Sequence, residues 1–219
     1  MTPVVWFDRL EVHLFEDDPM FRRLLASTLT FAAIATGTAS ATEAPAAPAS
    51  VSATATAAQQ TAELRARLEA GRRRLDFLAG PWELTLYNRN RDGDWIPNGT
   101  QSIVVEPSMN DLYLRLVIAT PGFNYEMTLS YDVVMGTYRV VSRDDQSGLI
   151  DVYEGNFTPD GSLVTTNLRS GTHYLAGSRR IHNRMTLTPG VNGWTSQIEG
   201  SGDEGATWRP QGRTEARRP

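Results

Sequence analysis

The sequence predicts an all-β fold, a closed antiparallel up-and-down barrel of about ten strands preceded by one N-terminal helix. From position 82 onward, apolar and polar residues alternate with a period of two, as they do in strands that bury one face. Turn-forming sequences such as Pro159-Asp160-Gly161 and Asn192-Gly193 separate these segments at short intervals. Closure is favoured over an open sheet because it leaves no unpaired edge strand.

Four alternating segments open the predicted barrel, at 82–87, 102–106, 112–118 and 123–131. Six more strands are expected at 137–143, 149–157, 162–168, 179–188, 193–199 and 206–216. Since side chains alternate between the two faces of a strand, positions of one parity form the expected inward face. These positions are Trp82, Leu84, Leu114, Leu116, Phe123, Tyr125, Met127, Tyr138 and Val140.

The N-terminal region has the layout of a secretory signal peptide at residues 20–41. A basic start at 20–23 precedes a weakly apolar run, and Ala39-Ser40-Ala41 matches the small-residue cleavage pattern. The apolar run is too short, and too rich in Ser, Thr and Gly, for a membrane anchor. We therefore expect an exported protein, periplasmic or secreted, with no membrane span after cleavage.

The segments around this signal differ from it in composition. Residues 1–19 carry several acidic side chains, which oppose the usual charge layout, so we expect translation to begin at Met20. Residues 42–60 are rich in Ala, Pro, Ser and Thr and predict a disordered linker. A leucine stripe at helical spacing predicts an amphipathic helix over 61–79 that covers one mouth of the barrel, and the barrel domain itself is expected over 80–217.

Composition excludes several classes of function. The net charge of −4 argues against a nucleic-acid partner, because such proteins carry a basic excess. The chain has no cysteine, which excludes disulfides, thiolate metal sites and a cysteine nucleophile. All 21 basic residues are arginine, so no lysine chemistry is available.

The sharpest local motif lies at residues 201–208, SGDEGATW, which has the spacing of an Asp-box hairpin. In such a hairpin Asp203 accepts bonds from backbone amides across the turn, Gly205 supplies a positive φ, and Trp208 packs beneath. Propellers that use this motif need several copies, and the chain has one. We therefore interpret it as a structural hairpin.

Metal and catalytic motifs are weak. Alternation places His182 with Arg180 and Arg184 on a solvent-exposed outer face, and His173 is expected in a loop or at a strand start, so no metal site is predicted. The polar segment at 88–94 imitates the start of a calcium loop but has Gly99 where the bidentate acid is needed. No nucleophile motif stands out, so no catalytic residue is assigned.

Several of these segments carry a family resemblance. The run at 75–83, LDFLAGPWE, resembles the opening of lipocalin-like barrels. The segments at 131–138, 147–155 and 160–163, with the final hairpin, are similar to a bacterial set labelled domain of unknown function fifteen-seventy-nine. This resemblance implies a closed barrel, frequent export and no established activity. Haem-binding cousins use a late histidine, which the expected last strand lacks, so no cofactor is predicted.

A barrel of this size can hold one small ligand. We therefore predict a small apolar or amphipathic ligand in the interior, with five candidate residues, Trp82, Tyr125, Met127, Tyr138 and Glu154. Two alternatives stay open. One is an enzyme of isomerase or hydrolase type that uses an interior Tyr/Glu pair, and the other is a filled barrel that acts as a surface interaction module. The sequence makes no prediction of oligomeric state.

Overall fold

The computed structural model describes residues 50–90, 92–120 and 123–219. The predicted signal peptide at 20–41, the segment 1–19 and the first part of the predicted linker lie outside these residues. No helix within the described part of the chain is both long enough and apolar enough to cross a membrane.

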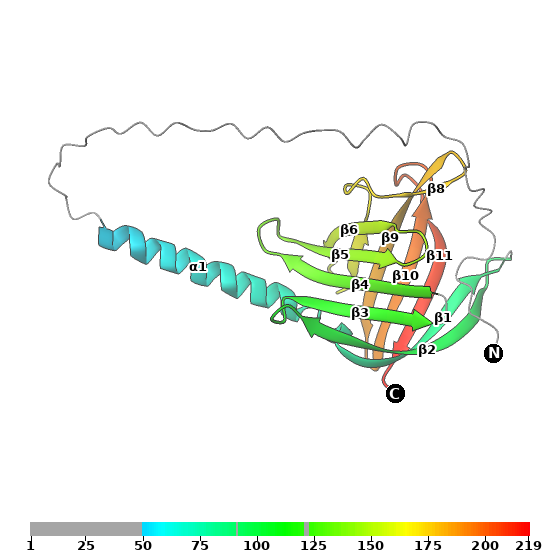
Figure 1. Ribbon diagram of the computed structural model, residues 1–219, viewed down its shortest axis with the longest axis horizontal. Coiled ribbons are helices and arrows are strands. Elements are labelled where there is room, and N and C mark those ends of the chain that lie inside the picture. Colours follow the sequence, from blue (N-terminus) through cyan, green and yellow to red (C-terminus); the bar gives the residue numbers. More distant parts are fainter. Residues whose placement is uncertain (1–49, 91, 121–122) are drawn as a thin grey trace.

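Ten strands close into an antiparallel barrel, which confirms the predicted fold class (Figure 1). Apart from β8, each strand pairs with the next one along the chain, and the pairing of β10 with β9 completes the ring that runs through β11 and β1. The short β8 pairs only with the start of β9 and stands outside the ring. The strands are β1 (Gly80–Arg89), β2 (Trp95–Ser108), β3 (Tyr113–Thr120), β4 (Phe123–Asp132), β5 (Thr137–Asp144), β6 (Ile150–Phe157), β7 (Leu163–Thr166), β8 (Tyr174–Ala176), β9 (Arg179–Gly190), β10 (Gly193–Ser201) and β11 (Arg209–Arg217).

Alternation decides which side chains fill the barrel. Across β3, β4 and β5, Leu114 pairs with Leu129 and Leu129 with Val140, so apolar residues of one parity meet row by row. Of the predicted inward set, the side chains on β1, β3 and β5 are buried, and those of Tyr125 and Met127 are partly buried against the core. The side chain of Phe123 lies outside the described part of the structure.

The helical N-terminal part differs from the prediction in its bounds. The helix α1 spans Ser50–Arg73, and a short 3-10 turn, η2, spans Asp76–Leu78. The helix therefore begins inside the segment predicted as a disordered linker at 42–60, because its alanine-rich sequence has high helix propensity and carries no proline beyond Pro48. It extends away from the barrel, and Leu64 on the predicted stripe is 43% exposed (Figure 1).

Only the C-terminal end of this helical segment covers the barrel. Leu75 and Leu78 are buried in the core, and the indole Nε1 of Trp82 donates to the Leu78 carbonyl at 2.7 Å. Gly71 lies so close to Tyr131 that a Cβ there would meet the ring at 2.2 Å, so only glycine fits. One end of the barrel, which we call the helix end, is thus closed by residues 71–78.

Candidate functional site

The opposite end of the barrel, which we call the far end, has a polar interior. In neighbouring strands Met127 pairs with Ser142 and Ser142 with Asp151, so these side chains lie in one row on the inner face. The residues that make this end polar are Tyr125, Ser142, Asp151, Tyr153, Asn167 and Asn183.

Asp151 is the centre of this polar cluster and is only 5% exposed. The side-chain amide of Asn167 donates to its two carboxylate oxygens at 3.0 and 3.1 Å, and the hydroxyl of Thr172 donates to Oδ1 at 2.5 Å. The Thr172 hydroxyl also accepts from the backbone N–H of Val152 at 3.1 Å. Because β7 ends at Thr166, the loop that follows uses these side-chain bonds to stay against β6 in place of strand pairing.

Asn183 links the cluster to β9. Its backbone N–H donates to Oδ1 of Asn167 at 2.7 Å, and its side-chain amide lies 3.5 Å from the hydroxyl of Tyr153. Two further acceptors nearby, Oδ1 of Asn183 and Oγ1 of Thr165, are buried and have no hydrogen-bond partner among the described residues. A buried polar atom without a partner costs about 1–3 kcal/mol. These two atoms are therefore the ones that gain most from a donor on a bound molecule.

The two phenols of the cluster are held in their neutral form. Burial raises the pKa of Tyr125 to about 12, with the nearby charges of Asp151 and Asp144 adding to it and a hydrogen bond with Ser142 opposing it. Burial, and then the charge of Asp151, raises the pKa of Tyr153 as well. Both hydroxyls therefore act at neutral pH as hydrogen-bond donors and acceptors, and neither is an activated nucleophile.

The five predicted ligand residues do not gather in one place. Tyr125 and Met127 lie at the far end, partly buried. Trp82 and Tyr138 lie at the helix end, where the Tyr138 hydroxyl donates to the Gly71 carbonyl at 2.9 Å. These two residues pack the helical segment onto the barrel.

Glu154 does not lie in the interior, so the predicted interior Tyr/Glu pair is absent from the described barrel. Its carboxylate forms an ion pair with Arg139 at 3.2 Å on the outer face, opposite in parity to the buried Tyr138 and Val140. The inward residues of β6 are Asp151 and Tyr153. Because β6 has polar residues at both odd and even positions, the alternation pattern does not show which face is buried. This explains why Glu154 was predicted to lie in the interior.

Four residues of the polar cluster were not predicted as site residues: Asp151, Asn167, Thr172 and Asn183. One signal was present, because Asp151 has the same parity as Tyr153 in the expected strand at 149–157, and an acid on a buried face needs hydrogen-bond partners. No sequence pattern indicated the contribution of the loop at 167–172, because its side chains contact β6 only in the folded protein.

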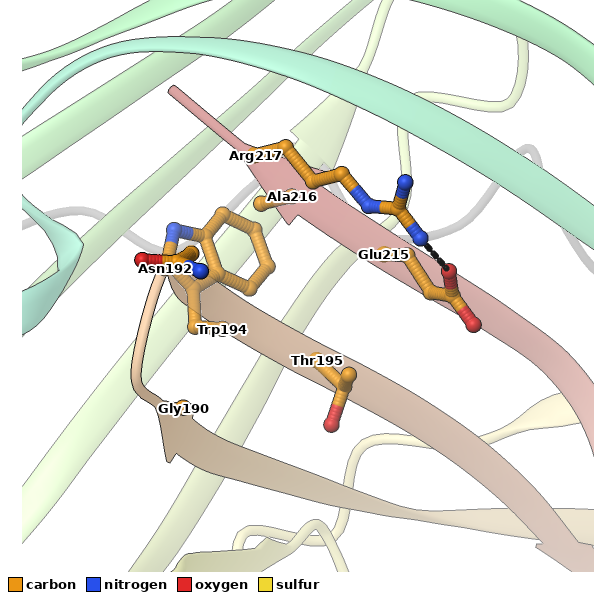
Figure 2. Close-up of a pocket in the computed structure, with 8 residues that line it drawn as sticks. Gly190, Asn192, Trp194, Thr195, Glu215, Ala216 and Arg217 are labelled. Atoms are coloured by element: carbon orange, nitrogen blue, oxygen red, sulfur yellow. Dashed lines mark hydrogen bonds and ion pairs between the residues drawn. The ribbon is translucent and has the colours of Figure 1, made fainter.

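A depression lies at the helix end, around the turn between β9 and β10 (Figure 2). It has a volume of about 400 Å³ and opens widely to solvent. Figure 2 shows Trp194 on one side and the ion pair of Arg217 with Glu215, 3.4 Å long, on the other. Trp194 packs edge-to-face on Trp82 at 6.1 Å between ring centroids, so its ring belongs to the core rather than to this surface.

The hairpin at 201–208 forms the bonds predicted for it. Oδ1 of Asp203 accepts from the Thr207 N–H at 2.9 Å, and Ser201 Oγ accepts from the Gly205 N–H at 2.8 Å. Gly205 has a φ of +86°. The Trp208 ring lies 4.7 Å from the guanidinium carbon of Arg184, in a cation–π contact.

The prediction that His182 is exposed is wrong. His182 does lie on the outer face of β9, but it is only 4% exposed because His173 and the hairpin at 201–208 cover it. Across the described ranges, no three His, Asp or Glu side chains stand ready to hold a metal ion.

No family model and no curated protein matches the chain.

Proposed function

We propose that the protein is an exported, lipocalin-like barrel that binds a small amphipathic molecule at the far end and has no catalytic role. The observation that supports it best is the polar cluster on the inner wall beside partly buried apolar side chains. Two acceptors there, on Asn183 and Thr165, have no partner among the described residues. Met127 and Ile198 supply apolar surface against the core.

The chemistry of the cluster favours binding over catalysis. Asp151 already accepts three hydrogen bonds from Asn167 and Thr172, which use most of the acceptor capacity of its carboxylate and disfavour a role in removing a proton from a substrate. The phenol of Tyr125 is held neutral by its raised pKa. The interior glutamate that the enzyme alternative needs is on the outer face. Export is proposed on the signal-like segment at 20–41 alone.

The test is displacement of a fluorescent fatty acid, dansyl-undecanoic acid, from the purified protein. We expect Met127→Trp to fill the far end and to weaken probe binding by about tenfold or more. The matched control is Thr128→Trp, which adds the same ring at the next residue of β4, on the outer face. Equal affinity of the two variants, or no binding by the unmodified protein, would overturn the proposal.

Native mass spectrometry of the protein purified from its own host gives a second, independent test. A bound small molecule of defined mass is expected on the unmodified protein and on Thr128→Trp, and its loss is expected on Met127→Trp. A mass equal to that of the bare chain in all three samples counts against the proposal.

A further inference from the structure

Asp151 is a charged side chain that points into the barrel and has no counter-ion in the described structure. It is 5% exposed and lies on the inner face of β6 together with Tyr153. None of the ion pairs within residues 50–90, 92–120 and 123–219 includes it. The buried side chains of the same ranges include no arginine. A buried carboxylate without a cation is costly, so this position favours a positive charge from outside the chain.

The hydrogen bonds of Asp151 do not supply that charge, because all three donors are neutral groups. The amide of Asn167 donates to both oxygens, and the hydroxyl of Thr172 donates to Oδ1. An ionised carboxylate has about four acceptor positions, two on each oxygen. The three bonds fill both positions on Oδ1 and one on Oδ2. One position on Oδ2 is therefore left for a further donor.

Two other polar atoms of this wall also lack a donor. Oδ1 of Asn183 and Oγ1 of Thr165 are buried without a hydrogen-bond partner in the described part of the chain. Asn183 is tied to the cluster by its backbone bond to Asn167, and Thr165 is in register with Met185, two residues further along β9. The amide oxygen of Asn183 can only accept, so a head group made of acceptors alone leaves it unpaired.

The charges that act on the two phenols have one sign. Burial is the main cause of the raised pKa of Tyr125, and the charges of Asp151 and Asp144 add to it. Burial and then the charge of Asp151 raise the pKa of Tyr153. None of the groups that shift these two pKa values is positively charged. The far end therefore has a negative potential, which attracts a cation and repels a carboxylate or a phosphate.

We propose that the molecule bound at the far end carries a protonated amine as its head group, with its apolar body against Met127 and Ile198. An ammonium group has three N–H donors and can bond to Oδ2 of Asp151 and to the amide oxygen of Asn183. This inference rests on the proposed function, because it names the ligand class of the same site. The dansyl fatty acid remains a suitable probe, since its sulfonamide N–H lies at the end opposite its carboxylate.

The test compares three amphiphiles of equal chain length and different head group: dodecylammonium, 1-dodecanol and dodecanoate. Each displaces the neutral fluorescent probe N-phenyl-1-naphthylamine from the full-length protein at pH 7, below its micelle concentration. We expect dodecylammonium to act at a concentration about tenfold or more below that of dodecanoate, with dodecanol between them. Dodecanoate or dodecanol as potent as dodecylammonium overturns this inference but not the proposed function. No displacement by any of the three overturns both.

Asp151→Asn then tests whether the charge of this residue sets the preference. Its affinity for dodecylammonium should fall by about tenfold or more, while its affinity for dodecanol should change by less than about threefold. The matched control is Glu154→Gln, which removes a carboxylate from the outer face of the same strand and should keep the preference. Unchanged dodecylammonium affinity in Asp151→Asn, or an equal loss in Glu154→Gln, overturns the inference. Circular dichroism checks folding, and if Asp151→Asn unfolds, the comparison of head groups on the unmodified protein decides.

Discussion

The two ends of the barrel are built from different chemistry. At the helix end, aromatic and aliphatic side chains such as Trp82, Trp194 and Leu78 pack together, and Trp82 also lies 3.7 Å beneath the guanidinium carbon of Arg218. At the far end, the inner wall carries Asp151, Asn167 and Asn183 in a hydrogen-bonded cluster. The same strands therefore contribute an end packed with apolar side chains and an end with a polar inner wall.

This difference separates stability from function within one fold. Burial of apolar area contributes most at the helix end, where few polar atoms need partners. The far end gains less from apolar burial and depends on hydrogen bonds, which require particular geometry. Two acceptor atoms there have no hydrogen-bond partner within the described structure. Substitutions at the helix end should therefore reduce stability most, and those at the far end should reduce it less and also change binding or pH dependence.

The largest effect is expected for Trp82→Ala at the helix end. It removes a side chain that is 3% exposed and contacts both the 3-10 turn and Trp194, so the free energy of unfolding should fall by about 3–5 kcal/mol. Trp95→Ala is the matched control. Trp95 is only partly buried, so its replacement should lower the free energy of unfolding by about 1 kcal/mol or less. Denaturant unfolding of both variants measures this, and equal losses would contradict the assignment of the helix end as the stabilising one.

Asp151→Ala comes next and tests the far end. It leaves the buried amide of Asn167 and the hydroxyl of Thr172 without their acceptor, which should lower the free energy of unfolding by about 2–3 kcal/mol. Amide hydrogen exchange should speed up most in the loop at 167–172. Asp94→Ala, in an exposed turn, should stay within about 0.5 kcal/mol of the unmodified protein. If both variants are equally stable, Asp151 is not the anchor of the loop.

Sequence alone predicted the barrel well, because alternation and turn residues are local signals. It failed where distant segments decide the environment. The parity of His182 was predicted correctly, but its burial depends on Glu204 and His173, which reach it only in the fold. Asp151 was not predicted to face inward because Asp151 and Glu154 lie on opposite faces of β6, and the alternation pattern allowed either one to be the inward acid. The helix begins before the predicted residue 61 because the alanine-rich segment that was interpreted as a linker also has high helix propensity.

A smaller effect is expected for the turn at 201–208. Hydrogen bonds from Thr207 and then Ser201 lower the pKa of Asp203 to about 2, below its ordinary value of 3.8. A lowered folded-state pKa contributes stability above pH 4 and loses it as the pH falls toward 2. As the pH is lowered over that range, the unfolding temperature should therefore fall more steeply for the unmodified protein than for Asp203→Asn, whose side chain does not titrate. If the unfolding temperatures of the two proteins fall in parallel, the hydrogen bonds in this turn do not depend on the charge of Asp203.

The smallest effect at neutral pH is expected for Tyr125→Phe, because the hydroxyl is neutral there in both the folded and the unfolded chain. The difference should emerge only in alkali. With the folded-state pKa raised from 10.0 to about 12, the unfolded chain loses this proton first, so stability declines as the pH rises through that window. Tyr125→Phe removes this contribution and should flatten the decline relative to the unmodified protein. Unfolding by denaturant at about pH 9 and pH 11 measures the difference, and identical pH dependence in Tyr125→Phe and the unmodified protein would show that Tyr125 is not desolvated at the far end.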